Sequence, residues 1–343
     1  MGRAWSALAG AALAVPFAMG TAAGSTPDGE VVCRLLDPQI IESSGLVVAG
    51  DLLATTNDSG DTGRVFAVDP DTGETVGVTT WSDDPTDVEA LAPAGEDAVW
   101  VGDIGDNPAS RKSIEVTRVP VGRSDRDVDE ETYDLAYPGG PVDAESLLSD
   151  PITGRLYVAT KEVFGGTLYA APAHPSPDGD NVLRPLGPIT GIATDGAFFP
   201  DGKHLVLRTY TDAVVYAFPS LHRVGSFALP AQEQGEGIAV GADGAVYLSS
   251  EGKRASVRRV ELPASIRRAM AGSPSGSPSE SPSGAPSPVR SESPSGSPTD
   301  APTEGPAEQP AEDSADPELW PWLAGLALFA GAVVVLLRSL RPR

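Results

Sequence analysis

Five segments of the sequence repeat one pattern, and this repetition restricts the fold more than any other feature of the chain. Each segment starts with a carboxylate and an apolar stretch, turns at Gly/Asp residues into a second apolar stretch, and ends with a loop and a third. The segments begin at Glu42, Glu89, Glu145, Asp195 and Glu236, so they recur every 41 to 56 residues. A period of about 40–50 residues is typical of a β-propeller, in which each repeat forms one four-stranded blade.

The apolar stretches have the composition of β-strands. The expected second strands, LLATT, AVWVG, RLYVA, HLVLR and AVYLS, are short and rich in β-branched and aromatic residues. A third strand follows in every repeat, and TVGVTTW, TYDLAY, NVLRPLG and HRVGSFAL are expected as fourth strands of the first four repeats. The fifth repeat lacks a fourth strand, and VVCRLLD at 31–37 is available to fill that place and close the ring without an open sheet edge.

We therefore predict an all-β protein, a β-propeller of about five four-stranded blades. Six blades would follow if one segment merges two repeats. A β-sandwich is the main alternative fold, but it would not explain why a carboxylate recurs at the head of every repeat.

Both ends of the chain differ in composition from the repeats. Residues 1–23 combine a basic residue, an apolar run and small residues, as in a secretory signal peptide. Residues 272–318 contain 11 prolines among 47 residues, which predicts a disordered Ser/Pro-rich stalk. Residues 319–337 are uncharged and long enough for a transmembrane helix, and the basic tail 338–343 suits a cytoplasmic end. The prediction is a type I single-pass membrane protein with an extracellular propeller domain at residues 31–262.

The expected extracellular domain is strongly acidic. Residues 31–270 contain 37 acidic and 19 basic side chains, a net charge of −18. This charge argues against nucleic acid and anionic lipid surfaces as partners and favours cations, cationic ligands or high solubility. The single cysteine, Cys33, is expected to be a small apolar core residue. The three histidines show no metal-ligand spacing, and no GxSxG motif or phosphate-binding glycine loop occurs.

A propeller would gather many of the acidic residues at one end of its central channel. The first strand of each blade lines the channel and the second runs antiparallel to it, so the start of the first and the end of the second lie on the same rim. We call this rim the mouth; the far rim carries the first hairpin of each blade. The ligand or metal candidates expected at the mouth are Glu42, Asp58, Asp87, Glu89, Asp103, Asp106, Asp143, Glu145, Asp195, Glu236 and Glu251, and the basic candidates are Lys161 and Arg208.

A ring of like charges needs compensation, and three interpretations are open. The carboxylates could accept backbone N–H groups and join neighbouring blades, with Lys161 and Arg208 as ion-pair partners. They could hold a cation, and oxygen ligands alone suit Ca²⁺ or Mg²⁺. They could also act as general acids and bases beside a metal. We predict a protein that binds a ligand, cation or protein partner at the mouth, with Ca²⁺ as the cofactor considered and no catalytic residue assigned. The alternatives are a metal-assisted hydrolase of phosphate or carboxylic esters and a purely structural scaffold.

Several motifs taken together resemble a known group of proteins. ESSGL, NDSG, the DxE-A/S-L heads and QGEGIA resemble the secreted bacterial β-propellers grouped as phytase-esterase-like, over roughly residues 38–262. GDIGDN, DAESLLSDPITGRLYVATKE and LRTYTDA look like an exported, membrane-anchored branch of such propellers. The resemblance implies a propeller outside a bacterial cell membrane and, for some relatives, ester hydrolysis at an acidic, Ca²⁺-assisted mouth. The chain departs from a site for highly phosphorylated substrates in having only Lys161 and Arg208 as clear basic candidates.

Overall fold

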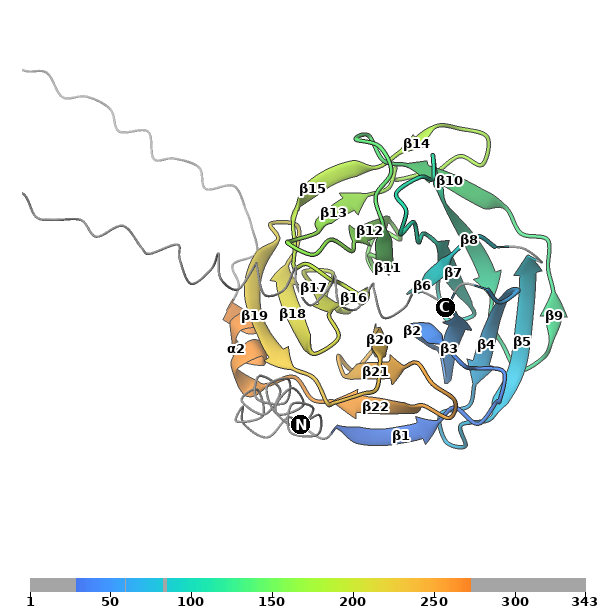
Figure 1. Cartoon of the computed structure of the whole chain (residues 1–343). Helices are drawn as coiled ribbons and strands as arrows, with labels where there is room; N and C mark the ends of the chain where they lie inside the picture. The colour runs from blue at the N-terminus through green and yellow to red at the C-terminus, as the bar shows by residue number, and fades with distance from the viewer. Residues whose placement is uncertain (1–28, 59, 83–84, 273–343) are drawn as a thin grey trace, which may run out of the picture. The chain divides into compact units, whose positions relative to one another are not determined.

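The computed structural model describes residues 29–272, apart from residues 59, 83 and 84. These residues form five sheets arranged as a ring (Figure 1). The prediction of an all-β, five-bladed propeller is confirmed. The predicted signal peptide, transmembrane helix and tail lie outside the described residues, as does the stalk apart from Gly272. No helix within the described part of the chain is long and apolar enough to cross a membrane.

Four blades are each built from strands in chain order. The first contains β2 (Ser43–Ala49), β3 (Leu52–Asn57), β4 (Gly63–Val68) and β5 (Thr75–Ser82); the second contains β6 (Val88–Pro93), β7 (Ala98–Asp103), β8 (Ile114–Pro120) and β10 (Thr132–Ala136). The third contains β11 (Ala144–Ser149), β12 (Leu156–Thr160), β13 (Thr167–Ala170) and β15 (Arg184–Pro188); the fourth contains β16 (Asp195–Phe198), β17 (His204–Arg208), β18 (Asp212–Ala217) and β19 (His222–Ala228). All strand pairings within these sheets are antiparallel, except for the pairings of two short additional strands, which are parallel.

The two added strands lie parallel to the outer edges of the first two blades. β9 (Arg126–Asp127) pairs with β5, and β14 (Asn181–Val182) pairs with β10. The second pairing corrects a prediction, because NVLRPLG was expected to be a single strand of the third blade. The Asn181 side chain donates a hydrogen bond to the Asp134 carbonyl at 2.9 Å, which holds this residue to the second blade and leaves only β15 in the third.

The fifth blade joins the two ends of the ring. It contains β20 (Gly235–Val240), β21 (Val246–Ser250) and β22 (Ser256–Val260), with β1 (Glu30–Arg34) as its outer strand. β1 runs antiparallel to β22, and Glu30 pairs with Arg259. Figure 1 shows β1 and β22 side by side. The predicted closure of the ring by the stretch at 31–37 is thus confirmed.

Apolar side chains fill each of the five interfaces between adjacent blades. The buried residues form five clusters, and each cluster combines strands of two neighbouring blades. Cys33 is buried in the cluster between the fifth and first blades, as expected, and burial raises its thiol pKa to about 11. Residues 29–272 contain all the strands of the ring, all five clusters and the closing strand pair. This segment therefore includes the packing that a complete propeller requires.

A short helix that was not predicted follows the last blade. Helix α2 (Ala264–Gly272) begins two residues after Leu262, where the sequence placed the end of the propeller domain. Its one buried residue, Ile266, packs into the cluster between the fourth and fifth blades. A single apolar anchor in nine residues leaves too weak a pattern to be found from sequence.

Candidate functional site

The register of the innermost strands places many of the candidate residues on one rim. The pairs at this rim are Ser43 with Asn57, Val88 with Asp103, Ala144 with Thr160, Asp195 with Arg208, and Gly235 with Ser250. Each pair joins the start of a first strand to the end of a second. The acidic candidates in or next to these pairs therefore lie on this rim. They differ in the residues to which they are hydrogen-bonded or ion-paired, and they are described below according to these contacts.

β-bulges set the position of three mouth glutamates. Glu89 and Glu145 each lie at a register shift near the start of their strand, and Glu236 lies within the shift between Gly235 and Ile238. A bulge adds one residue to a strand and changes the direction of a side chain. All three glutamates are only 5–6% exposed. The bulges therefore accompany the burial of three acidic side chains at the mouth.

Asp195 occupies the corresponding place in the fourth blade, where the pairing is regular. It is completely buried and accepts hydrogen bonds from the backbone N–H groups of Gly196 at 2.7 Å and Ile238 at 2.8 Å. Burial raises the pKa of this carboxyl well above its usual value, although these hydrogen bonds oppose the rise. Because Ile238 belongs to the fifth blade, Asp195 joins two blades and has a structural role.

Arg208 is also completely buried and joins the same two blades. Its guanidinium donates hydrogen bonds to the carbonyls of Gly237 at 2.7 Å and Ser249 at 2.8 Å, and to Gln232 Oε1 at 2.7 Å. Burial lowers the pKa of Arg208 to about 10. The sequence suggested an ion pair for this residue, but its hydrogen-bond partners within the described ranges are neutral oxygens.

Asp103 and Asp106 support the loop after β7. Asp103 accepts the backbone N–H of Asp87 at 2.9 Å and forms a 2.6 Å ion pair with Arg111. Asp106, which is 2% exposed, accepts the N–H of Arg111 at 2.8 Å and donates its own N–H to Asp143 at 2.9 Å. Asp103, Asp106 and Asp143 therefore each accept a hydrogen bond from another residue of this chain. Arg111 was not predicted as a site residue, and its only signal in the sequence is its place four residues after GDIGDN.

Lys161 neutralises one of the bulge glutamates. It forms an ion pair with Glu145, and its ammonium lies 5.6 Å from the centre of the Tyr210 ring. Burial raises the pKa of Glu145 to about 8, although Lys161 opposes the rise. Burial by itself would lower the pKa of Lys161, but the bond to Glu145 outweighs it and the pKa rises. The ion pair suggested for Lys161 is therefore present, and Tyr210, just after the end of the second strand β17, is its aromatic neighbour at the mouth.

Glu236, Glu251 and Glu42 lie on the side of the mouth formed by the fifth and first blades. Burial raises the pKa of Glu236 to about 7, against the opposing charge of Lys161. Glu251 accepts a hydrogen bond from Gln234 Nε2 at 2.5 Å. Burial raises its pKa too, and the charges of Asp58 and Glu42 add to the rise. These effects show that the carboxylates of this side share one electrostatic environment.

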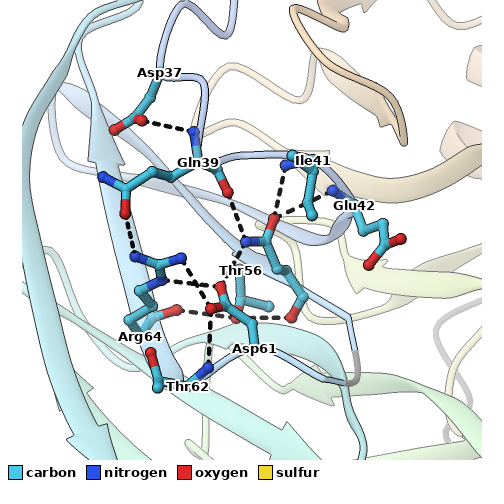
Figure 2. Close-up of polar contacts among 9 residues, drawn as sticks. Asp37, Gln39, Ile41, Glu42, Thr56, Asp61, Thr62 and Arg64 are labelled. Atoms are coloured by element: carbon cyan, nitrogen blue, oxygen red, sulfur yellow. Dashed lines mark hydrogen bonds and ion pairs between the residues drawn. The ribbon is translucent and has the colours of Figure 1, made fainter.

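Figure 2 shows Asp61, in the NDSGDTG loop of the first blade, beside Arg64, and the hydrogen bonds at the start of this loop are made by Asn57. Its side chain accepts the backbone N–H of Glu42 at 3.2 Å and donates to Asp61 Oδ2 at 2.6 Å. Asp61 in turn forms a 2.8 Å ion pair with Arg64. Asp61 is thus engaged in the loop itself, and Asp58 is the acidic residue of this loop that reaches the mouth carboxylates.

Asp58, Asp87 and Glu89 converge at the mouth. Each can place one carboxylate oxygen within 4.8 Å of an oxygen from both of the others. Gly105 permits this arrangement, because a Cβ at this position would overlap the Asp87 carboxylate and crowd Glu89. Ser44 Oγ lies 3.4 Å from Glu89 Oε2. These three carboxylates form the candidate metal centre.

Burial and neighbouring charges raise the pKa values of Glu89 and Asp87. Burial raises the pKa of Glu89 to about 10, and the charges of Asp58 and Glu145 add to this effect. Burial also raises the pKa of Asp87, with further contributions from Asp58 and Asp143. A cation placed among the three oxygens would remove the mutual repulsion that causes part of these shifts.

Comparisons with known proteins do not identify a family for this chain. No family model matches the chain, and no curated protein matches it. Similar solved structures include the glutaminyl cyclase of Myxococcus xanthus, with a TM-score of 0.45 and 11% identity over 68% of this chain and 97% of the other. A gluconolactonase from Xanthomonas campestris gives a TM-score of 0.40 and 13% identity over 69% and 96%. A nidogen/laminin complex gives 0.39 and 14% over 65% and 83%.

Proposed function

We propose that the propeller binds a divalent cation at its mouth through Asp58, Asp87 and Glu89, and that the mouth serves as a ligand-binding site. The observation that supports this most directly is the convergence of the three carboxylates within 4.8 Å. Two oxygens on opposite sides of a Ca²⁺ ion, each at about 2.4 Å, are about 4.8 Å apart. The spacing of the triad is therefore compatible with a shared Ca²⁺.

The chemistry of the triad supports the same cation. All three side chains offer oxygen, and hard cations such as Ca²⁺ prefer oxygen ligands. Glu89 is 5% exposed, and burying an anionic group is costly unless it is paired or coordinates a metal. Glu145 occupies the same position in the next blade as Glu89, and its charge is compensated by Lys161.

Our proposal for the location follows the composition of the chain ends. Residues 1–23 and 319–337 have the properties of an export signal and a membrane anchor, and the motifs resemble exported bacterial propellers. The mouth would then face the outside of a bacterial cell, where millimolar Ca²⁺ sites occur in other extracellular modules. The ligand that completes the coordination of the cation would come from this environment.

Calcium titration of the segment 29–272 tests the metal site. Calorimetry on protein pretreated with EDTA should show saturable binding of about one Ca²⁺, and Ca²⁺ at 100 times its Kd should stabilise the fold by about 2.7 kcal/mol. Glu89→Gln should weaken binding at least about tenfold, whereas Glu96→Gln, in an exposed hairpin of the far rim, should leave it unchanged. Absence of both heat and a shift in Tm would disprove the site.

Gly105→Ala provides a second test that removes no carboxylate. The added methyl group would occupy the space of the Asp87 carboxylate, so Ca²⁺ binding should weaken while the number of acidic residues stays the same. Normal Ca²⁺ affinity in this variant would show that Asp87 is not a ligand.

Metal-assisted ester hydrolysis is the second candidate function. It is favoured by the position of Glu145 and Glu236 at the same mouth, where buried carboxyls with raised pKa values are suited to proton transfer. p-Nitrophenyl phosphate and p-nitrophenyl acetate are suitable probes in the presence of Ca²⁺. Turnover that Glu89→Gln abolishes would support the hydrolase, and Ca²⁺ binding without turnover would support the binding function.

A further inference from the structure

The end of the central channel opposite the mouth contains a cavity of about 490 Å³. The first strands of all five blades contribute to its wall, together with hairpins of the far rim. The side chains that define it include Leu46, Leu91, Trp100, Phe198, Ile238 and Val240. None of the candidate carboxylates of the mouth lines this cavity. It is therefore a second site, apolar where the mouth is acidic.

The size and composition of this cavity match those of small-molecule sites. Such sites usually measure about 300–1,000 Å³ and are mostly apolar, with a few polar groups that orient the ligand. Trp100 contributes a fixed aromatic wall, since its ring is held edge-on against Tyr133 at a centroid distance of 5.8 Å. An aliphatic chain would gain by leaving water here, and each buried CH₂ group should strengthen binding about fourfold.

Two charged residues line the cavity, and they differ in their remaining capacity for hydrogen bonds. Asp150 is 6% exposed and uses both oxygens within its own turn, accepting the N–H of Ile152 at 2.9 Å and the hydroxyl of Thr153 at 2.6 Å. A ligand would have to displace these contacts to bind Asp150.

Arg118 is available to a ligand. Its side chain is 50% exposed, and it donates one hydrogen bond to the Ala94 carbonyl at 3.1 Å. Its distance to Asp97 is 3.8 Å, at the outer limit of an ion pair, and Asp97 is itself 88% exposed. A guanidinium has five N–H donors, so Arg118 can bind a carboxylate without losing its present partners.

We propose that this cavity binds a medium-chain aliphatic carboxylate, with the tail among the apolar residues of the channel and the carboxylate at Arg118. Charge complementarity selects the head group, because Arg118 is a donor and Asp150 is occupied. The apolar side chains of the wall suit an aliphatic tail. This site is independent of cation binding at the mouth.

Quenching of Trp100 fluorescence provides a direct test. In the segment 29–272, Trp81 and Trp100 are the two tryptophans, and Trp81 does not line the cavity. Trp81→Phe therefore makes the fluorescence specific for Trp100. The probes are ω-bromodecanoate and ω-bromodecanol, whose bromine quenches tryptophan on contact. We expect saturable quenching by both, with about tenfold tighter binding of the carboxylate.

Two arginine variants separate a specific head-group contact from general charge. Arg118→Met should remove the preference for the carboxylate and leave binding of the alcohol unchanged. Arg123→Met is the matched control, because Arg123 is 51% exposed, pairs with Asp51 and Asp69, and does not line the cavity. The control should keep the tenfold preference.

A filling variant tests the location of the tail. Val240→Phe places a larger side chain in the cavity and should weaken both probes, and circular dichroism would verify that the variant is folded. If Val240→Phe does not fold, the comparison of Arg118→Met with Arg123→Met still decides the proposal. Equal affinity for acid and alcohol, an unchanged preference in Arg118→Met, unchanged binding in a folded Val240→Phe, or no saturable quenching would each overturn it.

Discussion

Replacing Arg208 by methionine should loosen the junction between the fourth and fifth blades. The guanidinium extends from β17 to two carbonyls of the next blade, at Gly237 and Ser249, and to the side chain of Gln232. Methionine has a similar length, so the change removes the hydrogen bonds and the charge while it leaves little empty space. The two carbonyls would lose a buried donor.

The size of the effect follows from two opposing contributions. Three hydrogen bonds from a charged donor stabilise by about 1.5–3 kcal/mol each, about 4.5–9 kcal/mol together. The burial that lowers the pKa of Arg208 from 12.5 to about 10 corresponds to an unfavourable contribution of roughly 3 kcal/mol, which the variant recovers. The expected net loss in the free energy of unfolding is on the order of 4 kcal/mol.

Urea unfolding of the segment 29–272, followed by circular dichroism, would measure this loss. Arg223→Met serves as control, because Arg223 is exposed on β19 and donates a single hydrogen bond to Ser226 at 2.8 Å. The control should change stability by less than about 0.5 kcal/mol. A loss below about 1 kcal/mol for Arg208→Met would refute the reasoning, since it would mean that the three hydrogen bonds contribute no more than the cost of burying the charge.

Gly235→Ala extends the test to the shape of the junction. A Cβ at Gly235 would overlap the guanidinium of Arg208, so glycine is required there by close approach. The alanine variant should destabilise the wild-type protein more than it destabilises Arg208→Met, and a double-mutant cycle should give a coupling energy of about 1–3 kcal/mol. Additive effects of the two changes would contradict this packing.

Three further changes have expected outcomes. Folded Glu236, with its pKa raised to about 7, retains a proton that the unfolded chain loses near pH 4.5. In melts with EDTA, the fall in stability from pH 5 to pH 8 should therefore be smaller in Glu236→Gln than in the wild type by on the order of 2 kcal/mol; identical pH dependence would contradict this. Deleting residues 29–35 removes β1 and exposes β22, so the thermal transition should shift down by at least about 10 °C; an unchanged Tm would show that closure is dispensable. Asp103→Asn should weaken the ion pair with Arg111 and destabilise by about 1–3 kcal/mol with or without Ca²⁺; an effect seen only with Ca²⁺ would contradict a structural role.

The ring could be predicted from the sequence because the residues that specify each blade are close together in the chain. Each blade is specified by short apolar strands and turns, and the spacing of the repeats counts the blades. The missing fourth strand after Leu262 and the unassigned stretch at 31–37 together indicated the closure. The split of 181–187 between two blades was not predictable in this way, since it depends on the contact between Asn181 and the carbonyl of a distant residue.

The role of each carboxylate could not be predicted, because it depends on partners far apart in the chain. Glu89 and Asp195 hold equivalent places in their repeats, but a bulge occurs at Glu89 and regular pairing at Asp195. One is therefore part of a triad and the other accepts backbone N–H groups. The apolar cavity was equally hidden, since five separate strands each contribute a small part of its wall.

The pairing of β1 with β22 also determines when the molecule can become complete. Contacts at this junction join positions up to 229 residues apart, such as Arg258 with the Gly29 carbonyl. A ribosome makes the chain from its N-terminus, so β1 is synthesised before its partner β22 and stays unpaired while the first four blades emerge. Non-local strand pairing is slow because a long loop must close first. Ring closure should therefore be the last step of folding during synthesis, and a nascent chain that stops before β22 would present unpaired strand edges to chaperones and to other chains.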